Sequence, residues 1–119
     1  MSDNICKEKS KKFAVQIVRM YQHLTKDQKE FVLSKQVLRS GTSIGANIAE
    51  SECAISRKDF LAKLYIALKE CSETRFGLEL LRDTDYLSET EFNSIYENCN
   101  ELMRILSAST KTLRQSEKN

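Results

Sequence analysis

Three glutamates in the middle of the chain are the residues that could hold metal ions. Glu50, Glu70 and Glu73 could project from adjacent helices of a bundle. Metal-carboxylate bundles also need a Glu-x-x-His sequence on each of two helices. The one histidine, His23, has no glutamate three residues before it, so the sequence does not support such a site. We expect His23 near the end of a helix, as a dipole-complementing or surface residue.

The four cysteines offer a second kind of chemistry, because paired thiols bind zinc or exchange disulfides. Cys6, Cys53, Cys71 and Cys99 lie far apart and form no C-x-x-C pair, so neither a zinc site nor a thioredoxin-type motif is indicated. Cys71 and Cys99 fall on apolar stripes, where a free cysteine acts as a small hydrophobic residue. No signal-peptide pattern is present, and we expect reduced thiols in a cytoplasmic protein.

Other catalytic and binding motifs are missing from the sequence. Neither G-x-x-x-x-G-K-[ST] nor G-x-G-x-x-G occurs, so nucleotide binding has no motif. Ser, His and Asp fall in no recognisable catalytic pattern. No apolar run approaches the roughly 20 residues that cross a bilayer. We therefore expect no enzymatic activity, no cofactor, no metal and no membrane partner.

Nucleic-acid binding would need a basic face, whereas the formal net charge is only +2. Six basic residues that assembly could bring together are the candidates for contacts with RNA or DNA: Lys7, Lys11, Lys12, Arg39, Lys58 and Lys63. A ring of subunits would multiply the small positive excess of each one. The alternative for the N-terminal lysines is a solvated helix start.

Composition and start signals favour a single all-α domain over residues 1–119. The chain has no proline and only three glycines, so it lacks the usual boundaries of strands and hairpins. Cap residues precede carboxylates by three positions at three places: Asp27 with Glu30, Ser56 with Asp59, and Ser88 with Glu91. Such pairs satisfy the free N–H groups of a first helical turn. The signals predict helices over about residues 8–24, 28–54, 57–83 and 89–115.

Apolar residues repeat in alternating steps of three and four inside each predicted helix. The seams of the first and second helices comprise Phe13, Ile17, Met20 and Leu24, and Val37, Gly41, Ile44 and Ile48. The seam of the third helix comprises Phe60, Leu64, Ala67, Cys71, Thr74, Leu78 and Leu81, and that of the fourth comprises Phe92, Ile95, Cys99, Leu102, Leu106, Ser109 and Leu113. Seams of this kind pack knobs into holes. With short connections between the helices, they predict an up-and-down antiparallel four-helix bundle.

Further apolar residues lie outside these seams. In the third helix Leu61, Tyr65 and Leu68 form a second stripe, and Ile66 lies on yet another face. A helix that is apolar over more than one stripe has more surface to bury than one core covers, which suggests self-association. The alternative is a wide core-facing stripe in a monomer.

Gly41 and Gly45 lie four apart within the predicted second helix. Each costs about 1 kcal/mol relative to alanine in a helix interior, so a structural reason is expected. Close approach of another backbone over this small-residue patch is one reason, and a loop at these glycines is the alternative.

The chain resembles a known family over residues 38–81, which read LRSGTSIGANIAESECAISRKDFLAKLYIALKECSETRFGLELL, most specifically in RSGTSIGANIAES and DFLAKLYIALKE. This family comprises the four-helix bundle proteins named for the 23S rRNA intervening sequence, which are encoded within bacterial large-subunit rRNA genes and elsewhere. The resemblance implies a bundle that assembles into a ring-like homo-oligomer, commonly a pentamer, without known catalytic activity. A related branch assists the reverse transcriptase of diversity-generating retroelements and binds nucleic acid. That branch is strongly basic, unlike this chain.

The family's polar signature maps onto Asn47, Glu50 and Glu73, with Arg39 as a counter-charge within the subunit or across an interface. Such a stripe can fix helix register or subunit pairing because its hydrogen bonds must be satisfied. The alternative is an exposed polar face with no special role. Where the family often has an acidic residue and two aromatics, this chain has Arg75, Phe76 and Gly77, which should alter local packing.

From these observations we predict a non-enzymatic, homo-oligomeric helical scaffold that could serve RNA, DNA or a nucleic-acid enzyme as an accessory protein. The alternative is a protein–protein interaction scaffold that binds no nucleic acid. Both hypotheses depend on assembly, and the sequence does not separate them.

Overall fold

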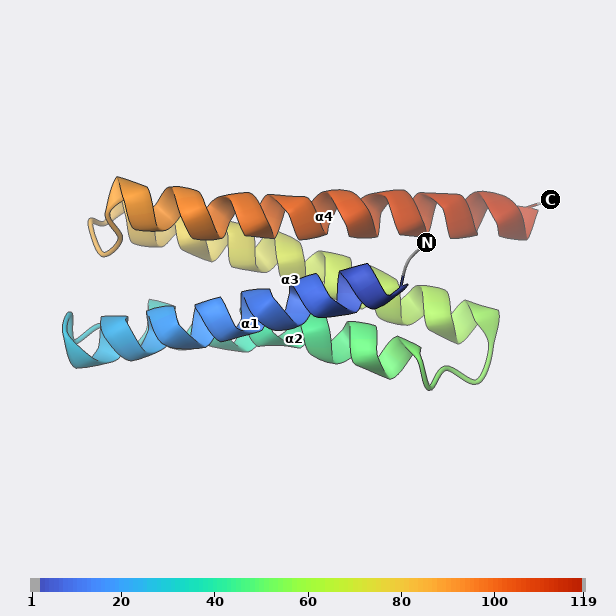
Figure 1. Ribbon diagram of the computed structural model, residues 1–119, viewed down its shortest axis with the longest axis horizontal. Helices are drawn as coiled ribbons and strands as arrows, with labels where there is room; N and C mark the ends of the chain where they lie inside the picture. The colour runs from blue at the N-terminus through green and yellow to red at the C-terminus, as the bar shows by residue number, and fades with distance from the viewer. Residues whose placement is uncertain (1–2, 119) are drawn as a thin grey trace.

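In the computed structural model, which describes residues 3–118, four helices follow one another along the chain: α1 (Asp3–Lys26), α2 (Leu33–Ser51), α3 (Arg57–Asp83) and α4 (Glu89–Lys118). They lie lengthwise side by side, and their connections alternate between the two ends of the molecule (Figure 1). No strand occurs within residues 3–118. The predicted all-α class is confirmed.

The helices surround one apolar core. Each helix packs against the one before it and α4 also contacts α1, with the most extensive contact between α2 and α3 and the least extensive between α1 and α4. The predicted seams supply most of the core: Phe13, Ile17, Leu24, Val37, Ile44, Ile48, Leu64, Ala67, Cys71, Leu78, Leu81, Phe92, Ile95, Cys99, Leu102 and Leu106. Met20, Phe60 and Leu113 pack against this core while only partly buried.

The predicted start of the second helix near residue 28 was wrong. The amide of Asp27 bonds instead to the carbonyl of His23 at 2.9 Å, which continues α1. Lys29 then takes a left-handed backbone conformation with φ of 57°, which no helix continues. The second helix therefore begins at Leu33, and it ends at Ser51 rather than near residue 54.

Glu30 provides the cap that the sequence pattern assigned to Asp27. Its carboxylate accepts hydrogen bonds from the backbone N–H groups of Val32, Leu33 and Ser34, the last at 2.6 Å. Burial raises the pKa of Glu30, but these N–H donors together bring it below its usual value. The cap is therefore ionised at neutral pH, where it satisfies the first amides of α2.

The other two start signals are confirmed. The Ser56 hydroxyl accepts a hydrogen bond from the Asp59 amide at 3.0 Å, and α3 begins at Arg57. Ser88 and Glu91 form a reciprocal capping box, with side chain-to-amide distances of 3.1 and 3.2 Å, and α4 begins at Glu89.

The glycines mark close contacts between neighbouring helices, which involve the partner's backbone only at Gly45. Gly41 and Gly45 lie inside α2, and not in a loop, with α1 next to them. A Cβ atom at Gly41 would lie 2.9 Å from Ile17, and one at Gly45 would lie 3.3 Å from the Ser10 hydroxyl. Gly77 in α3 is the tightest position, because a Cβ atom there would lie only 2.4 Å from Cγ2 of Val37 in α2.

We expect Gly77→Ala to lower the free energy of unfolding by about 1–3 kcal/mol, because the added methyl group would overlap the stiff Val37 side chain. This loss should outweigh the roughly 1 kcal/mol that alanine gains in helix propensity. Urea denaturation measures the difference. Gly45→Ala is the matched control and should cost less stability, since its Cβ atom would lie 3.3 Å from the nearest atom rather than 2.4 Å. A Gly77→Ala protein as stable as the parent would contradict the close α2–α3 contact.

Candidate functional site

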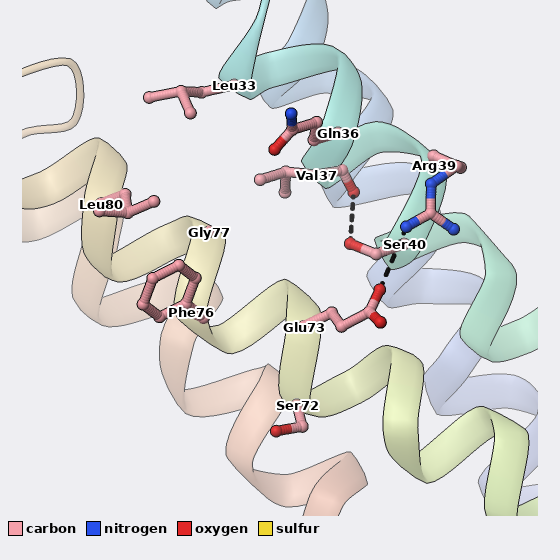
Figure 2. Close-up of a pocket in the computed structure, with 10 residues that line it drawn as sticks. All are labelled: Leu33, Gln36, Val37, Arg39, Ser40, Ser72, Glu73, Phe76, Gly77 and Leu80. Carbon is pink, nitrogen blue, oxygen red and sulfur yellow. Dashed lines mark hydrogen bonds and ion pairs between the residues drawn. The ribbon is translucent and has the colours of Figure 1, made fainter.

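An ion-pair bridge joins α2 to α3 on the surface of the bundle. The Arg39 guanidinium of α2 lies 3.3 Å from a carboxylate oxygen of Glu70 and 3.1 Å from one of Glu73. The two glutamates lie three residues apart, so they share one face of α3. Arg39 and Glu73 reach toward each other across the gap between the helices (Figure 2).

The bridge is partly withdrawn from water. Glu70 is only 9% exposed, whereas Arg39 and Glu73 are exposed. A buried carboxylate needs a compensating charge, which Arg39 supplies. One residue further along α2, the Ser40 hydroxyl lies 2.8 Å from the Thr74 hydroxyl inside the core. Polar contacts thus fix the register of α2 against α3 from the core outward.

Beside the bridge is a groove with a volume of about 400 Å³. It is lined from α2 by Leu33, Gln36, Val37, Arg39 and Ser40, and from α3 by Ser72, Glu73, Phe76, Gly77 and Leu80 (Figure 2). Phe76 is 63% exposed beside Gly77. The departure from the family pattern noted above therefore places a large ring in water beside a position that has no side chain.

A second seam lies on α3 beside its contact with α2, with Glu70 buried and Ile66 and Glu73 exposed. Ile66, Glu70, Glu73, Gly77 and Leu80 follow each other in steps of four, three, four and three, which is the repeat of helix-to-helix packing. Ile66 is 41% exposed. We call this seam, together with Phe76 and Arg39, the α2–α3 face.

The predicted polar signature is only partly brought together. Arg39 and Glu73 are joined by the bridge, whereas the Asn47 amide donates to the backbone carbonyl of Ser43 at 2.9 Å within α2. The exposed Glu50 side chain makes no ion pair or hydrogen bond with the described part of the chain, whereas its backbone carbonyl accepts one from the Cys53 amide at 3.0 Å. The counter-charges of Arg39 are therefore Glu70 and Glu73 across the helices.

The candidate nucleic-acid contacts also separate into two groups. Arg39 is engaged by the bridge, and Lys7 lies 3.2 Å from Glu52. The other four, which are Lys11, Lys12, Lys58 and Lys63, form no ion pair with any residue described in the structure. Lys58 and Lys63 lie in the first two turns of α3, whereas Lys11 and Lys12 lie in the third turn of α1.

The potential metal ligands are dispersed. His23 lies 2.8 Å from Asp27 and 3.8 Å from Glu91, at the seam between α1 and α4. Over the described residues, no group of three or more His, Cys, Asp or Glu side chains could hold a metal ion. Nor is any described helix long and apolar enough to span a bilayer.

Two features of the site were not predicted from the sequence. Glu70 was considered only as a metal ligand, although its place between Ala67, Cys71 and Thr74 of the core seam signals burial. The exposure of Phe76 could not be read from its residue type, because a phenylalanine beside a seam is more often buried.

Comparison with known proteins finds a matching family model and a similar crystal structure. A family model described as "23S rRNA-intervening sequence protein" matches residues 2–108, which include all of α2 and α3. A crystal structure from Bacteroides thetaiotaomicron VPI-5482 is similar, with a TM-score of 0.91 and 53% sequence identity over 93% of this chain and 99% of that chain. It is described as a protein of unknown function from the S23 ribosomal protein family. No curated protein matches the chain.

We expect Arg39→Met to lower the free energy of unfolding by about 1–2 kcal/mol, because it leaves Glu70 buried without a counter-charge. The exposure of Arg39 keeps the loss below that of a fully buried pair. Arg104→Met, at an exposed arginine of α4, is the control and should change stability by less than about 0.5 kcal/mol. Adding Glu70→Gln to Arg39→Met should recover part of the loss. Equal urea midpoints for the two arginine variants would show that the bridge contributes nothing.

Proposed function

The chain belongs to the 23S rRNA-intervening sequence protein family, and we propose that it is a non-enzymatic scaffold that assembles with copies of itself through the α2–α3 face. The observation that carries the proposal is the exposure of Phe76 and Ile66 beside the Arg39 bridge. Apolar side chains on a face whose charged groups are already paired with one another favour contact with another protein surface.

A ring requires two different faces on each subunit, because only head-to-tail contacts close into a ring of more than two copies. The second face that we propose is on α1, where Val15 and Val18 are exposed in a shallow groove of about 430 Å³. Lys11 and Arg19 flank these valines. The family resemblance implies five copies, which is the number we propose.

The bridge gives such an assembly its specificity. Glu70 and Glu73 hold Arg39 in place, so the polar part of the α2–α3 face is ordered before a neighbouring subunit arrives. Preorganised groups lose less conformational entropy on association than free side chains do. The apolar residues then supply the favourable burial.

We expect the protein to sediment as a multiple of its 13.7 kDa chain mass between about 1 and 100 µM, since assembly follows mass action. Phe76→Glu together with Ile66→Glu should shift it to the monomer, because both charges would be buried in the contact without partners. Ile55→Glu is the control, since Ile55 is 94% exposed in the α2–α3 connection and lies off the face. Circular dichroism verifies that each variant stays helical.

A monomer at all of these concentrations would refute the scaffold proposal. Assembly of the double variant equal to that of Ile55→Glu would refute the choice of face.

A second candidate function is nucleic-acid binding by the assembled ring, in an accessory role. Four lysines of α1 and α3 favour it, because Lys11, Lys12, Lys58 and Lys63 are exposed or half-exposed and have no carboxylate partner among the described residues. Each copy in a ring would add its own four lysines to the positive electrostatic field of the assembly. The alternative is a scaffold that binds only protein.

We expect short single-stranded RNA or duplex DNA to bind near 50 mM salt and to be released steeply as salt rises, because phosphate contacts displace counterions. Lys58→Glu with Lys63→Glu should weaken binding by about tenfold or more and flatten the salt dependence. Lys29→Glu with Lys35→Glu, at the opposite end, is the matched control. Fluorescence anisotropy measures both. No binding near 50 mM salt would eliminate this function and leave the protein-only scaffold.

A further inference from the structure

Two cysteines meet in the core where α3 packs against α4. The Sγ atoms of Cys71 and Cys99 lie 3.8 Å apart, and both residues are 0% exposed. Each thiol also reaches the backbone carbonyl of the other residue, at 3.3 Å from Cys71 and 3.5 Å from Cys99. Both side chains therefore point across the interface, and the two backbones approach closely there.

The two thiols differ in their electrostatic surroundings. The hydrogen bond with the Cys99 thiol lowers the pKa of Cys71 against the opposing effect of burial, and Arg75 acts in the same direction. The same hydrogen bond and burial both raise the pKa of Cys99. Cys71 is thus the thiol that more readily becomes a thiolate, which is the nucleophilic form.

We propose that Cys71 and Cys99 form a redox pair, which hydrogen peroxide converts into a disulfide that fixes α3 to α4. The Cys71 thiolate attacks one peroxide oxygen, the O–O bond breaks, and Cys71 becomes a sulfenic acid while hydroxide leaves and is protonated. The Cys99 sulfur, giving up its proton, then attacks Cys71 Sγ and displaces the sulfenic oxygen as water. In total two thiols and one peroxide give one disulfide and two water molecules.

The geometry suits this reaction within one subunit. The sulfur atoms must close from 3.8 Å to the roughly 2.05 Å of a disulfide, and adjustments of the two side-chain torsions and the packed helices can supply this movement. Burial keeps out bulky disulfide reagents, whereas peroxide is small enough to enter during local opening of the bundle. Cys53 is exposed in the α2–α3 connection and would instead react with other molecules.

The disulfide would link α3 covalently to α4 and stabilise the bundle without changing its fold. It would close the segment from residue 71 to residue 99, which contains the connection between α3 and α4. Closing such a loop restricts the unfolded chain. The oxidised protein should therefore melt about 5–15 °C higher than the reduced one. This inference does not depend on assembly or on nucleic-acid binding.

The test uses the full chain carrying Cys53→Ser, treated with hydrogen peroxide under native conditions. We expect the accessible-thiol count after unfolding to fall from three to one, the intact mass to fall by two hydrogen atoms, and a linked peptide pair to contain Cys71 and Cys99. Reduction with dithiothreitol should reverse all three changes and the rise in Tm. Adding Cys71→Ala or Cys99→Ala should abolish the linked pair, and circular dichroism verifies that these variants fold.

Either of two results would overturn the proposal. One is oxygen addition to one cysteine without any linked peptide pair. The other is a linked pair that forms only in denaturant, which would show that the native geometry does not bring the thiols into reaction.

Discussion

The close approach of α2 to α3 is the constraint on which the rest of the structure depends. Gly77 removes the side chain that would otherwise strike Val37, and the Ser40 and Thr74 hydroxyls meet at 2.8 Å in the core. Only at this separation can Arg39 reach both Glu70 and Glu73. The groove beside Phe76 is lined by residues of both helices, Gly77 among them. The bridge and the groove thus both lie along the contact between α2 and α3.

The seam between α1 and α4 is built differently. Polar pairs bridge it near the surface, including Lys9 with Glu101 at 3.0 Å and Asn98 with Gln16 at 2.9 Å. Exposed pairs of this kind contribute little to stability, and this is the least extensive helix contact in the bundle. The helix contact between α2 and α3 is thus the strongest in the bundle, and the contact between α1 and α4 is the weakest. A disulfide between Cys71 and Cys99 would additionally fix α4 to α3.

The sequence predicted those parts of the fold that follow from local spacing. The periodic seams identified the core, and Ser56 and Ser88 marked the starts of α3 and α4, because caps and amphipathic repeats act within a few residues. It misplaced the start of α2, since a Glu30 carboxylate acting as the cap resembles no standard pattern.

The site was predicted less well, because the partners of Arg39 lie on another helix. Likewise, Cys71 and Cys99 are far apart in the sequence, and only packing brings them together.

Native-state hydrogen exchange tests the central claim most directly, because it ranks the helices by the free energy at which each one opens. If the α2–α3 contact holds the bundle together, amides around Ile44 in α2 and Thr74 in α3 should exchange only through global unfolding. Amides of α1 near Gln16 should exchange earlier, through smaller openings. Exchange of the α2 amides at lower free energy than those of α1 would contradict the account.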